Sequence, residues 1–143
     1  YASIFIHFSL EYFKPKLLLS EKLTRFITLF LILMLIPVVI LNSGKEYTFV
    51  NYSFLIFTLV IGLRFGLQYL RRFYIAFLII LIPFLLVNGV LTGTGLEEPV
   101  VWYNNDENLG FRLLTIPIED IGYAFTMIFS NVFLIEKFKK FGL

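Results

Sequence analysis

The sequence of 143 residues contains no cysteine and a single histidine, His7. Without cysteine it has no disulfides, no thiol nucleophile and no cysteine-based zinc or iron–sulfur site, and one histidine does not make a histidine-rich metal site. Charge is also scarce. Only 15% of the residues are charged, against about 25% in soluble proteins. The net charge of +2 is too small and too scattered for a nucleic-acid-binding surface. We therefore expect no metal and no nucleic-acid partner.

Apolar residues are abundant: 59% of the chain is hydrophobic and 19% is aromatic. A single domain of this length does not have the interior to hide so much apolar surface from water. The composition therefore excludes an ordinary soluble enzyme and predicts an integral, multi-pass membrane protein.

Four stretches are long enough to cross a hydrocarbon core of about 30 Å as helices. Residues 26–44, 47–63 and 73–96 are free of charge, and residues 113–135 are apolar apart from Glu119 and Asp120. Residues 1–13 form an apolar run too short to span. We predict an all-α, polytopic transmembrane helical bundle with four full spans and one partial N-terminal helix. The chain opens inside an apolar run at Tyr1 rather than at a methionine, so we expect it to be a fragment that lacks its N-terminal part.

The loops between the spans alternate in charge. Basic residues gather in 14–25, at Arg71 and Arg72 and in the tail at 137–140, whereas residues 93–111 are acidic. Lysine and arginine in short loops mark the cytoplasmic side. The pattern predicts a cytoplasmic C-terminus and an external acidic loop.

Glu119 and Asp120 are the acids that the composition would not place in a bilayer. We expect Pro117 in the first turn of the last helix, where its missing N–H costs nothing, with both acids in that turn, about 9–11 Å beyond a membrane entry near Leu113, and Arg112 at the interface. An arginine beside two carboxyls could be a plain helix-anchoring ion pair. Charges inside a membrane also mark functional sites, and a dry site can keep one carboxyl neutral and the other ionised, which equips it for proton transfer. Both interpretations stay open at this point.

Three other polar residues rank lower. For Arg64 and Asn88 we expect a side chain that extends from a helix end to the membrane surface or one that forms an interhelical hydrogen bond. We expect Asn131 to join two helices by a hydrogen bond. Tyr103 is close enough to the acids to line a pocket.

The segment from Tyr103 to Asp120 resembles the membrane-embedded, heterodimer-type lycopene cyclases. Their signature is a proline, one residue, then Glu followed by Glu or Asp, preceded by a glycine–x–arginine segment; here the matching residues are Gly110, Arg112, Pro117, Glu119 and Asp120. The resemblance implies that residues 1–16 end the last helix of a preceding repeat, and that residues 17–143 form a second repeat with four transmembrane helices.

The resemblance also implies the chemistry: a non-redox, flavin-independent cyclisation, without cofactor, of the ends of a linear carotenoid hydrocarbon to β-ionone rings. Glu119 would be the acid and Asp120 the second carboxylate, with exchangeable roles. Arg112 would keep one of them ionised and Pro117 would set the helix start. The aromatic residues nearest to the expected cation are Tyr103, Phe111, Tyr123 and Phe125.

Two departures limit what carries over. The second acid is Asp, the less common choice, and the family uses two carboxylate motifs whereas this chain has one. We expect the other motif on a missing N-terminal repeat or partner subunit, and the fragment alone to be inactive. The alternatives are a related carotenoid end-group enzyme (a hydratase or a cyclase of longer carotenoids) and a non-catalytic partner half or carotenoid-binding scaffold.

Overall fold

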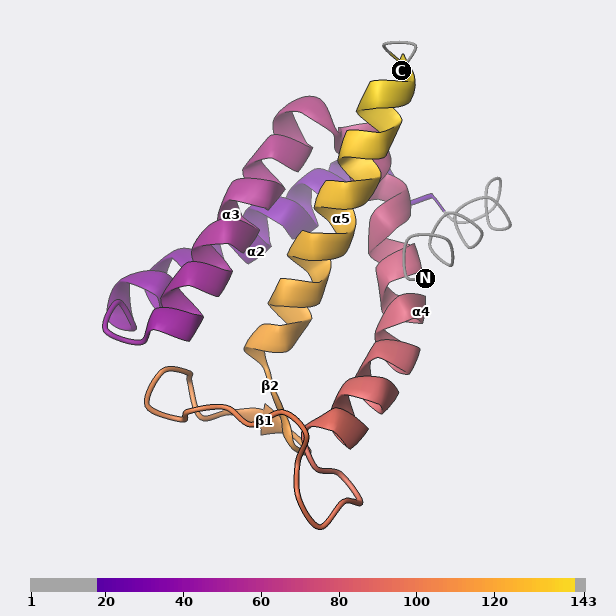
Figure 1. The fold of residues 1–143 in the computed structure, drawn as a ribbon. Helices are drawn as coiled ribbons and strands as arrows, with labels where there is room; N and C mark the ends of the chain where they lie inside the picture. Colours follow the sequence, from indigo (N-terminus) through magenta and orange to yellow (C-terminus); the bar gives the residue numbers. More distant parts are fainter. Residues whose placement is uncertain (1–17, 141–143) are drawn as a thin grey trace.

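The computed structural model describes residues 18–140. It contains four helices, α2 (Glu21–Leu41), α3 (Glu46–Phe65), α4 (Leu67–Leu91) and α5 (Glu119–Lys140), and two short strands, β1 (Arg112–Leu113) and β2 (Ile116–Pro117) (Figure 1). All four helices are long and apolar enough to cross a membrane, which confirms the all-α class and the four full spans. The predicted partial helix at 1–13, the 1–16 unit and His7 lie outside the described residues. The cytoplasmic position of the C-terminus stays a prediction.

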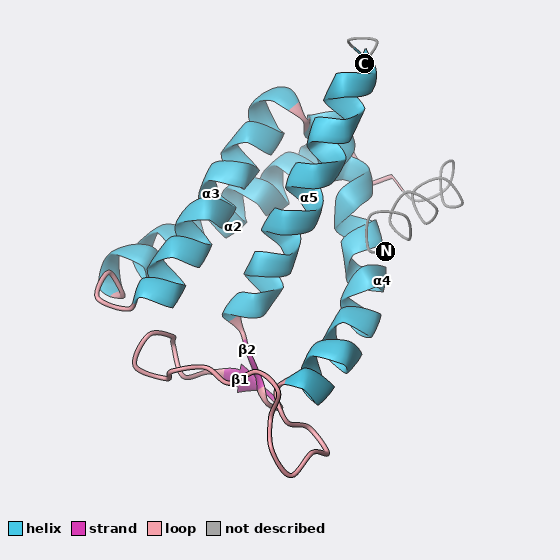
Figure 2. Ribbon diagram, viewed as in Figure 1, coloured by secondary structure: helices cyan, strands magenta, loops and turns pink. Residues whose placement is uncertain are grey.

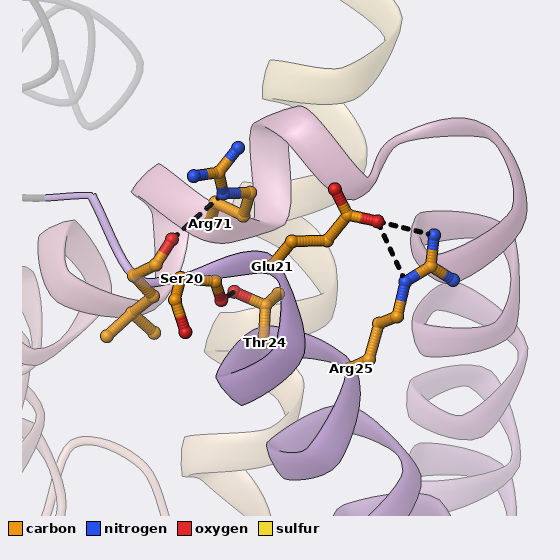
Figure 3. Close-up of polar contacts among 6 residues, drawn as sticks. Ser20, Glu21, Thr24, Arg25 and Arg71 are labelled. Carbon is orange, nitrogen blue, oxygen red and sulfur yellow. Dashed lines mark hydrogen bonds and ion pairs between the residues drawn. The ribbon is translucent and has the colours of Figure 1, made fainter.

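Helix α2 begins at a polar N-cap on the end of the bundle opposite the strands (Figure 3). The Leu23 N–H donates to the Ser20 hydroxyl, and the exposed Glu21 and Arg25 form an ion pair at 2.9 Å. Arg71 at the start of α4 donates to the Leu19 carbonyl at 2.8 Å. The Leu19 N–H donates in turn to the Arg71 carbonyl at 3.2 Å, so these two hydrogen bonds between Leu19 and Arg71 join the segment before α2 to α4.

Aromatic rings of α4 and α5 form the centre of the bundle. The ring centroids of Phe73 and Phe125 lie 4.9 Å apart, and those of Phe73 and Phe129 lie 5.1 Å apart. A Cβ at Gly62 of α3 would lie 2.7 Å from Leu70 Cδ1 and 3.1 Å from Phe129 Cε1. Glycine is therefore required where α3 packs most closely on this cluster.

The opposite faces of the helices expose large apolar side chains, which is what a lipid-facing surface requires. These side chains include Leu33, Leu41, Leu78, Leu86 and Phe57.

The last span begins later than predicted. Residues 112–117 form an antiparallel hairpin whose two strands, β1 and β2, have two residues each. Arg112 pairs with Pro117, and α5 begins at Glu119 (Figure 2). The hairpin turn places Leu114 at a φ of +58°, in the left-handed region that tight hairpin turns use. The prediction that Pro117 lies in the first helical turn is therefore wrong, as is the helical entry from Leu113. The prediction that both acids lie in the first turn of the helix is confirmed.

Candidate active site

Glu119 and Asp120 lie where β2 runs into α5, at the end of the bundle that carries the hairpin (Figure 1). Their side chains are almost completely buried, with exposed fractions of 0% and 2%. Acidic side chains are favoured in the first turn of a helix by the macrodipole, but burying two of them requires hydrogen-bond donors from the surrounding elements.

The two carboxyl oxygens of Glu119 have different surroundings. Oε1 accepts a hydrogen bond from the Thr48 hydroxyl and another from the Leu109 N–H, each at 2.7 Å. Oε2 is buried and has no hydrogen-bond partner among the described residues. A buried polar oxygen without a partner is costly whether or not it carries a hydrogen. Among the described residues, Oε1 is the oxygen held by donors and Oε2 is the one without a partner.

Asp120 has donors on both oxygens. The Tyr47 hydroxyl donates to Oδ1, and the Tyr103 hydroxyl and the Asn88 amide donate to Oδ2 at 2.8 and 2.7 Å. The two adjacent acids thus have different surroundings: Asp120 accepts hydrogen bonds on both carboxyl oxygens, whereas Glu119 accepts them on one.

Arg112 does not contact either acid. Its guanidinium donates to the Thr115 carbonyl at 2.7 Å and to Asn105 Oδ1 at 2.6 Å, and it lies 5.9 Å from the centre of the Tyr103 ring. The expected ion pair with the acids is therefore wrong for the described part of the chain. The physical reason is the hairpin, because β1 is exposed and places Arg112 outside the buried pair.

The acidic loop between α4 and β1 contacts the start of α3 beside the acids. Glu107 accepts the Glu46 N–H at Oε2, at 2.9 Å, and the Thr48 N–H at its main-chain carbonyl, at 3.2 Å. Lys45 donates to the Asn108 carbonyl at 2.9 Å. These contacts join the loop to the first turn of α3. They place the Leu109 N–H beside Glu119 and satisfy main-chain donors that have no partner inside the helix.

Burial raises the pKa of the Tyr103 phenol to about 12, and the hydrogen bond to Asp120 adds to this effect. The phenol is therefore protonated at neutral pH and remains available as a donor to Asp120.

A cavity of about 540 Å³ is lined by residues that flank the acids in sequence, although neither acid is itself among the described residues that line it. Tyr52 of α3, Ile118 before α5 and Gly122 of α5 border it near the site, and Tyr52 lies close enough to Glu119 for the two groups to interact electrostatically. The rest of its lining is apolar and comes from all four helices: Leu19, Ile27, Leu31, Leu35, Leu55, Leu59, Tyr74, Ile75, Phe77, Leu78, Ile121 and Phe125. The volume is in the usual range of small-molecule sites, roughly 300–1,000 Å³.

The four aromatic residues predicted from the sequence have different positions. Phe125 lines the cavity, and Tyr103 contacts Asp120 instead. Phe111 and Tyr123 are exposed, by 71% and 50%. Two of the four are thus joined to the site, and two lie on the surface.

Sequence reasoning missed the polar residues of α3. Tyr47, Thr48 and Asn51 lie at the start of a span, where polar side chains are common at the membrane interface, so they gave no distinct signal. Their spacing was the available signal, because residues three and four apart share one face of a helix.

The three polar residues that ranked lower in the sequence, Arg64, Asn88 and Asn131, have different surroundings. Asn88 makes an interhelical hydrogen bond, to Asp120. Asn131 is exposed and donates to the Met127 carbonyl of its own helix, at 2.7 Å, so its expected role between helices is wrong among the described contacts. Arg64 is exposed at the end of α3, with its guanidinium 5.0 Å from the centre of the Phe65 ring.

Comparison with known proteins identifies one family. A sequence model described as lycopene cyclase matches residues 44–138, more than half of the chain, and this range contains both acids and all their hydrogen-bond partners. No curated protein and no solved structure matches. The match confirms the resemblance carried by the residues from Tyr103 to Asp120.

Proposed function

The chain belongs to the lycopene cyclase family, and from this premise we propose that it forms β-ionone rings from the end groups of lycopene by a proton-initiated, non-redox reaction. The observation that carries the proposal is the asymmetry of the acid pair. Glu119 has a buried carboxyl oxygen with no donor among the described residues, whereas Asp120 accepts three hydrogen bonds. Environments that separate the protonation states of two neighbouring carboxyls assign one as acid and the other as base.

In the first step, Glu119 transfers the proton on Oε2 to the terminal double bond of the substrate. A C–H bond forms at one alkene carbon, a tertiary carbocation forms at the other, and Glu119 becomes a carboxylate. Its Oε1 already accepts from Thr48 and Leu109, so part of the new negative charge meets donors that are in place. Such preorganisation reduces the reorganisation that a charge-forming step otherwise requires.

In the second step, the neighbouring double bond attacks the cation and closes the six-membered ring. The positive charge moves to a ring carbon, and loss of a proton from the adjacent carbon forms the ring double bond. Asp120 receives that proton. The reaction consumes one proton and releases one, so it needs neither oxidant nor reductant.

The apolar cavity suits a hydrocarbon substrate. Its wall contains the aromatic rings of Tyr52, Tyr74, Phe77 and Phe125. The face of an aromatic ring attracts a cation by about 2 kcal/mol or more when water is excluded. A carbocation held in this cavity would thus lie among aromatic side chains.

The test is production of the full-length gene product in a cell that accumulates lycopene, with the carotenoids separated and identified by chromatography and absorption. We expect β-ring products, and a loss of about 10²–10⁴-fold in ring formation for Glu119→Gln and for Asp120→Asn. Glu136→Gln is the matched control, because Glu136 lies far along the same helix and pairs with Lys139. Immunoblots of the membrane fraction correct for differences in protein level.

Each alternative gives a distinct result. Hydroxylated acyclic products would assign the chain to the hydratases, and rings formed only on longer carotenoids would change the substrate. Undiminished ring formation by both acid variants would show that the chain is a scaffold whose acids do not carry the chemistry.

A further inference from the structure

Two of the three donors to Asp120 are phenols. The Tyr47 and Tyr103 hydroxyls both bond to its carboxylate, and the centres of the two rings lie 5.5 Å apart. Tyr47 belongs to the first turn of α3, whereas Tyr103 belongs to the segment between α4 and β1. The buried base is therefore joined by a hydroxyl group to a segment outside the helices.

Tyr103 is half-buried and lies between exposed residues. Its neighbours Trp102 and Asn104 are exposed, and the polar Asn105 and Asp106 that follow are exposed as well. The third donor to Asp120, the amide of Asn88, holds its hydrogens on nitrogen and does not readily pass them on. Both phenols bonded to Asp120 are half-buried, and Tyr103 is the one that belongs to the polar loop.

We propose that Tyr103 carries protons between Asp120 and water on the loop side of the bundle, which resets the base after each ring is formed. This inference rests on the proposed function. When Asp120 has taken the proton from the substrate, its O–H donates to the Tyr103 oxygen. The proton moves to that oxygen as the original phenolic hydrogen leaves to a water molecule. Each atom ends with its usual number of bonds, and the Asp120 carboxylate is restored. The same path in reverse brings a proton from water to Asp120 and on to the Glu119 carboxylate, which restores the acid and closes the cycle.

Arg112 lies beside the Tyr103 ring but takes no part in this path. Its guanidinium lies 5.9 Å from the centre of the Tyr103 ring and is held by Thr115 and Asn105. An arginine keeps its proton at every physiological pH, so it orients the ring but does not relay. Tyr103 is thus a positioning and relay residue, since it contacts the base rather than the substrate.

The experiment counts deuterium in the product. Membranes containing the full-length protein convert unlabelled lycopene over many turnovers in D₂O, and mass spectrometry measures the deuterium in each new ring. If Asp120 exchanges with solvent through Tyr103, each ring receives about one deuterium, because every proton donated by the acid comes from solvent. In Tyr103→Phe the hydrogen taken from one substrate stays in the site and is passed to the next. We expect the deuterium content to fall below about half that of the unchanged protein.

Tyr123→Phe is the matched control. It removes the same hydroxyl from a half-exposed residue of α5, and its product should carry the same label as that of the unchanged protein. If Tyr103→Phe forms no ring under steady conditions, a single-turnover measurement is made with protein in excess over lycopene. The first ring uses the proton already on Glu119 and needs no exchange with water, so we expect it to form.

The outcomes separate the two proposals. Absence of rings from the unchanged protein would refute the proposed function itself. Rings without deuterium from the unchanged protein, or the same deuterium content in Tyr103→Phe, would refute the relay and leave the cyclase in place. A Tyr103→Phe protein that is slow but fully labelled, or that fails in the first turnover, would show a structural role only.

Discussion

Gly122 provides the sharpest test of how closely α3 and α5 must pack for the acids to work. It lies on α5, three residues after Glu119, and borders the cavity. A Cβ at this position would lie 3.1 Å from Tyr52 Cε1, 3.2 Å from Leu55 Cδ2 and 3.3 Å from Asn51 Oδ1. Three atoms of α3 would each have to move by a few tenths of an ångström to admit one methyl group.

The stabilising and destabilising effects of Gly122→Ala on the free energy of unfolding nearly cancel. Replacing glycine by alanine inside a helix stabilises it by about 1 kcal/mol, and burying a methyl group adds about 0.8 kcal/mol. Overpacking a tight contact costs about 1–3 kcal/mol. We therefore expect a change of less than about 1–2 kcal/mol in the free energy of unfolding.

The effect on activity is larger, because the residue that must give way is joined to the acid. Asn51 donates to the main-chain carbonyl of Glu119 at 3.0 Å. A misplacement of about 1 Å at a catalytic group can cost about 10²-fold in rate, so a shift of a few tenths should lower ring formation by roughly tenfold.

Two measurements are compared: ring formation per amount of folded protein, and the unfolding midpoint in detergent. Gly44→Ala is the control, since a Cβ there meets nothing within 4 Å. Gly122→Ala protein with unchanged turnover would refute the argument, and so would a loss of activity that merely follows a loss of folded protein.

Three further predictions concern the donors around the acids. Glu107→Gln, which weakens the acceptor at the start of α3, should lower the free energy of unfolding by about 0.5–2 kcal/mol, whereas Glu98→Gln in the exposed loop should leave it unchanged. Asn88→Leu removes a 2.7 Å donor from a buried carboxylate and should cost about 1–3 kcal/mol in unfolding measurements. The control Asn131→Leu removes only an exposed contact within α5; equal losses for the two asparagines would contradict the assignment. Because burial raises the pKa of Tyr103 from 10.0 to about 12, the unfolded state loses this proton first, so the contribution of Tyr103 to stability should be fully present below about pH 10 and be lost between about pH 10 and 12. Unfolding midpoints measured across this range should fall less steeply in Tyr103→Phe, and an unaltered slope would contradict the raised pKa.

The spans could be predicted from the sequence because a bilayer imposes a strong and simple constraint. Three charge-free runs and a fourth that carries only the two acids are long enough to cross hydrocarbon, and a helix forms in each of the four. The start of the last span was misplaced for a local reason. Residues 113–118 are apolar, and hydropathy alone does not distinguish an apolar hairpin from the first turns of a helix. The hairpin depends on a positive φ at Leu114, a backbone conformation that a leucine in the sequence does not predict.

The acids themselves could be predicted, but their partners could not. Glu119 and Asp120 were identified because carboxyls in an apolar run are costly. Thr48 and Tyr47 precede them by about seventy positions, and their contacts with the acids arise only because α3 packs beside α5. Arg112 was favoured because it is near in sequence, but the hairpin points it away from the acids.

The partners of Asp120 are neutral donors instead of the arginine that the sequence suggested, and this difference matters for a cationic intermediate. A guanidinium about 4 Å from a carbocation would repel it by about 4 kcal/mol at an effective dielectric constant of 20. In the proposed reaction it would also neutralise the charge of the carboxylate that receives the proton. Two phenols and an amide stabilise the Asp120 anion by hydrogen bonds and leave its net negative charge in place. Arg112→Gln should therefore change ring formation much less than Asn88→Leu does, although only the arginine carries a charge. A larger loss in Arg112→Gln would show that the guanidinium reaches the acids when substrate is bound.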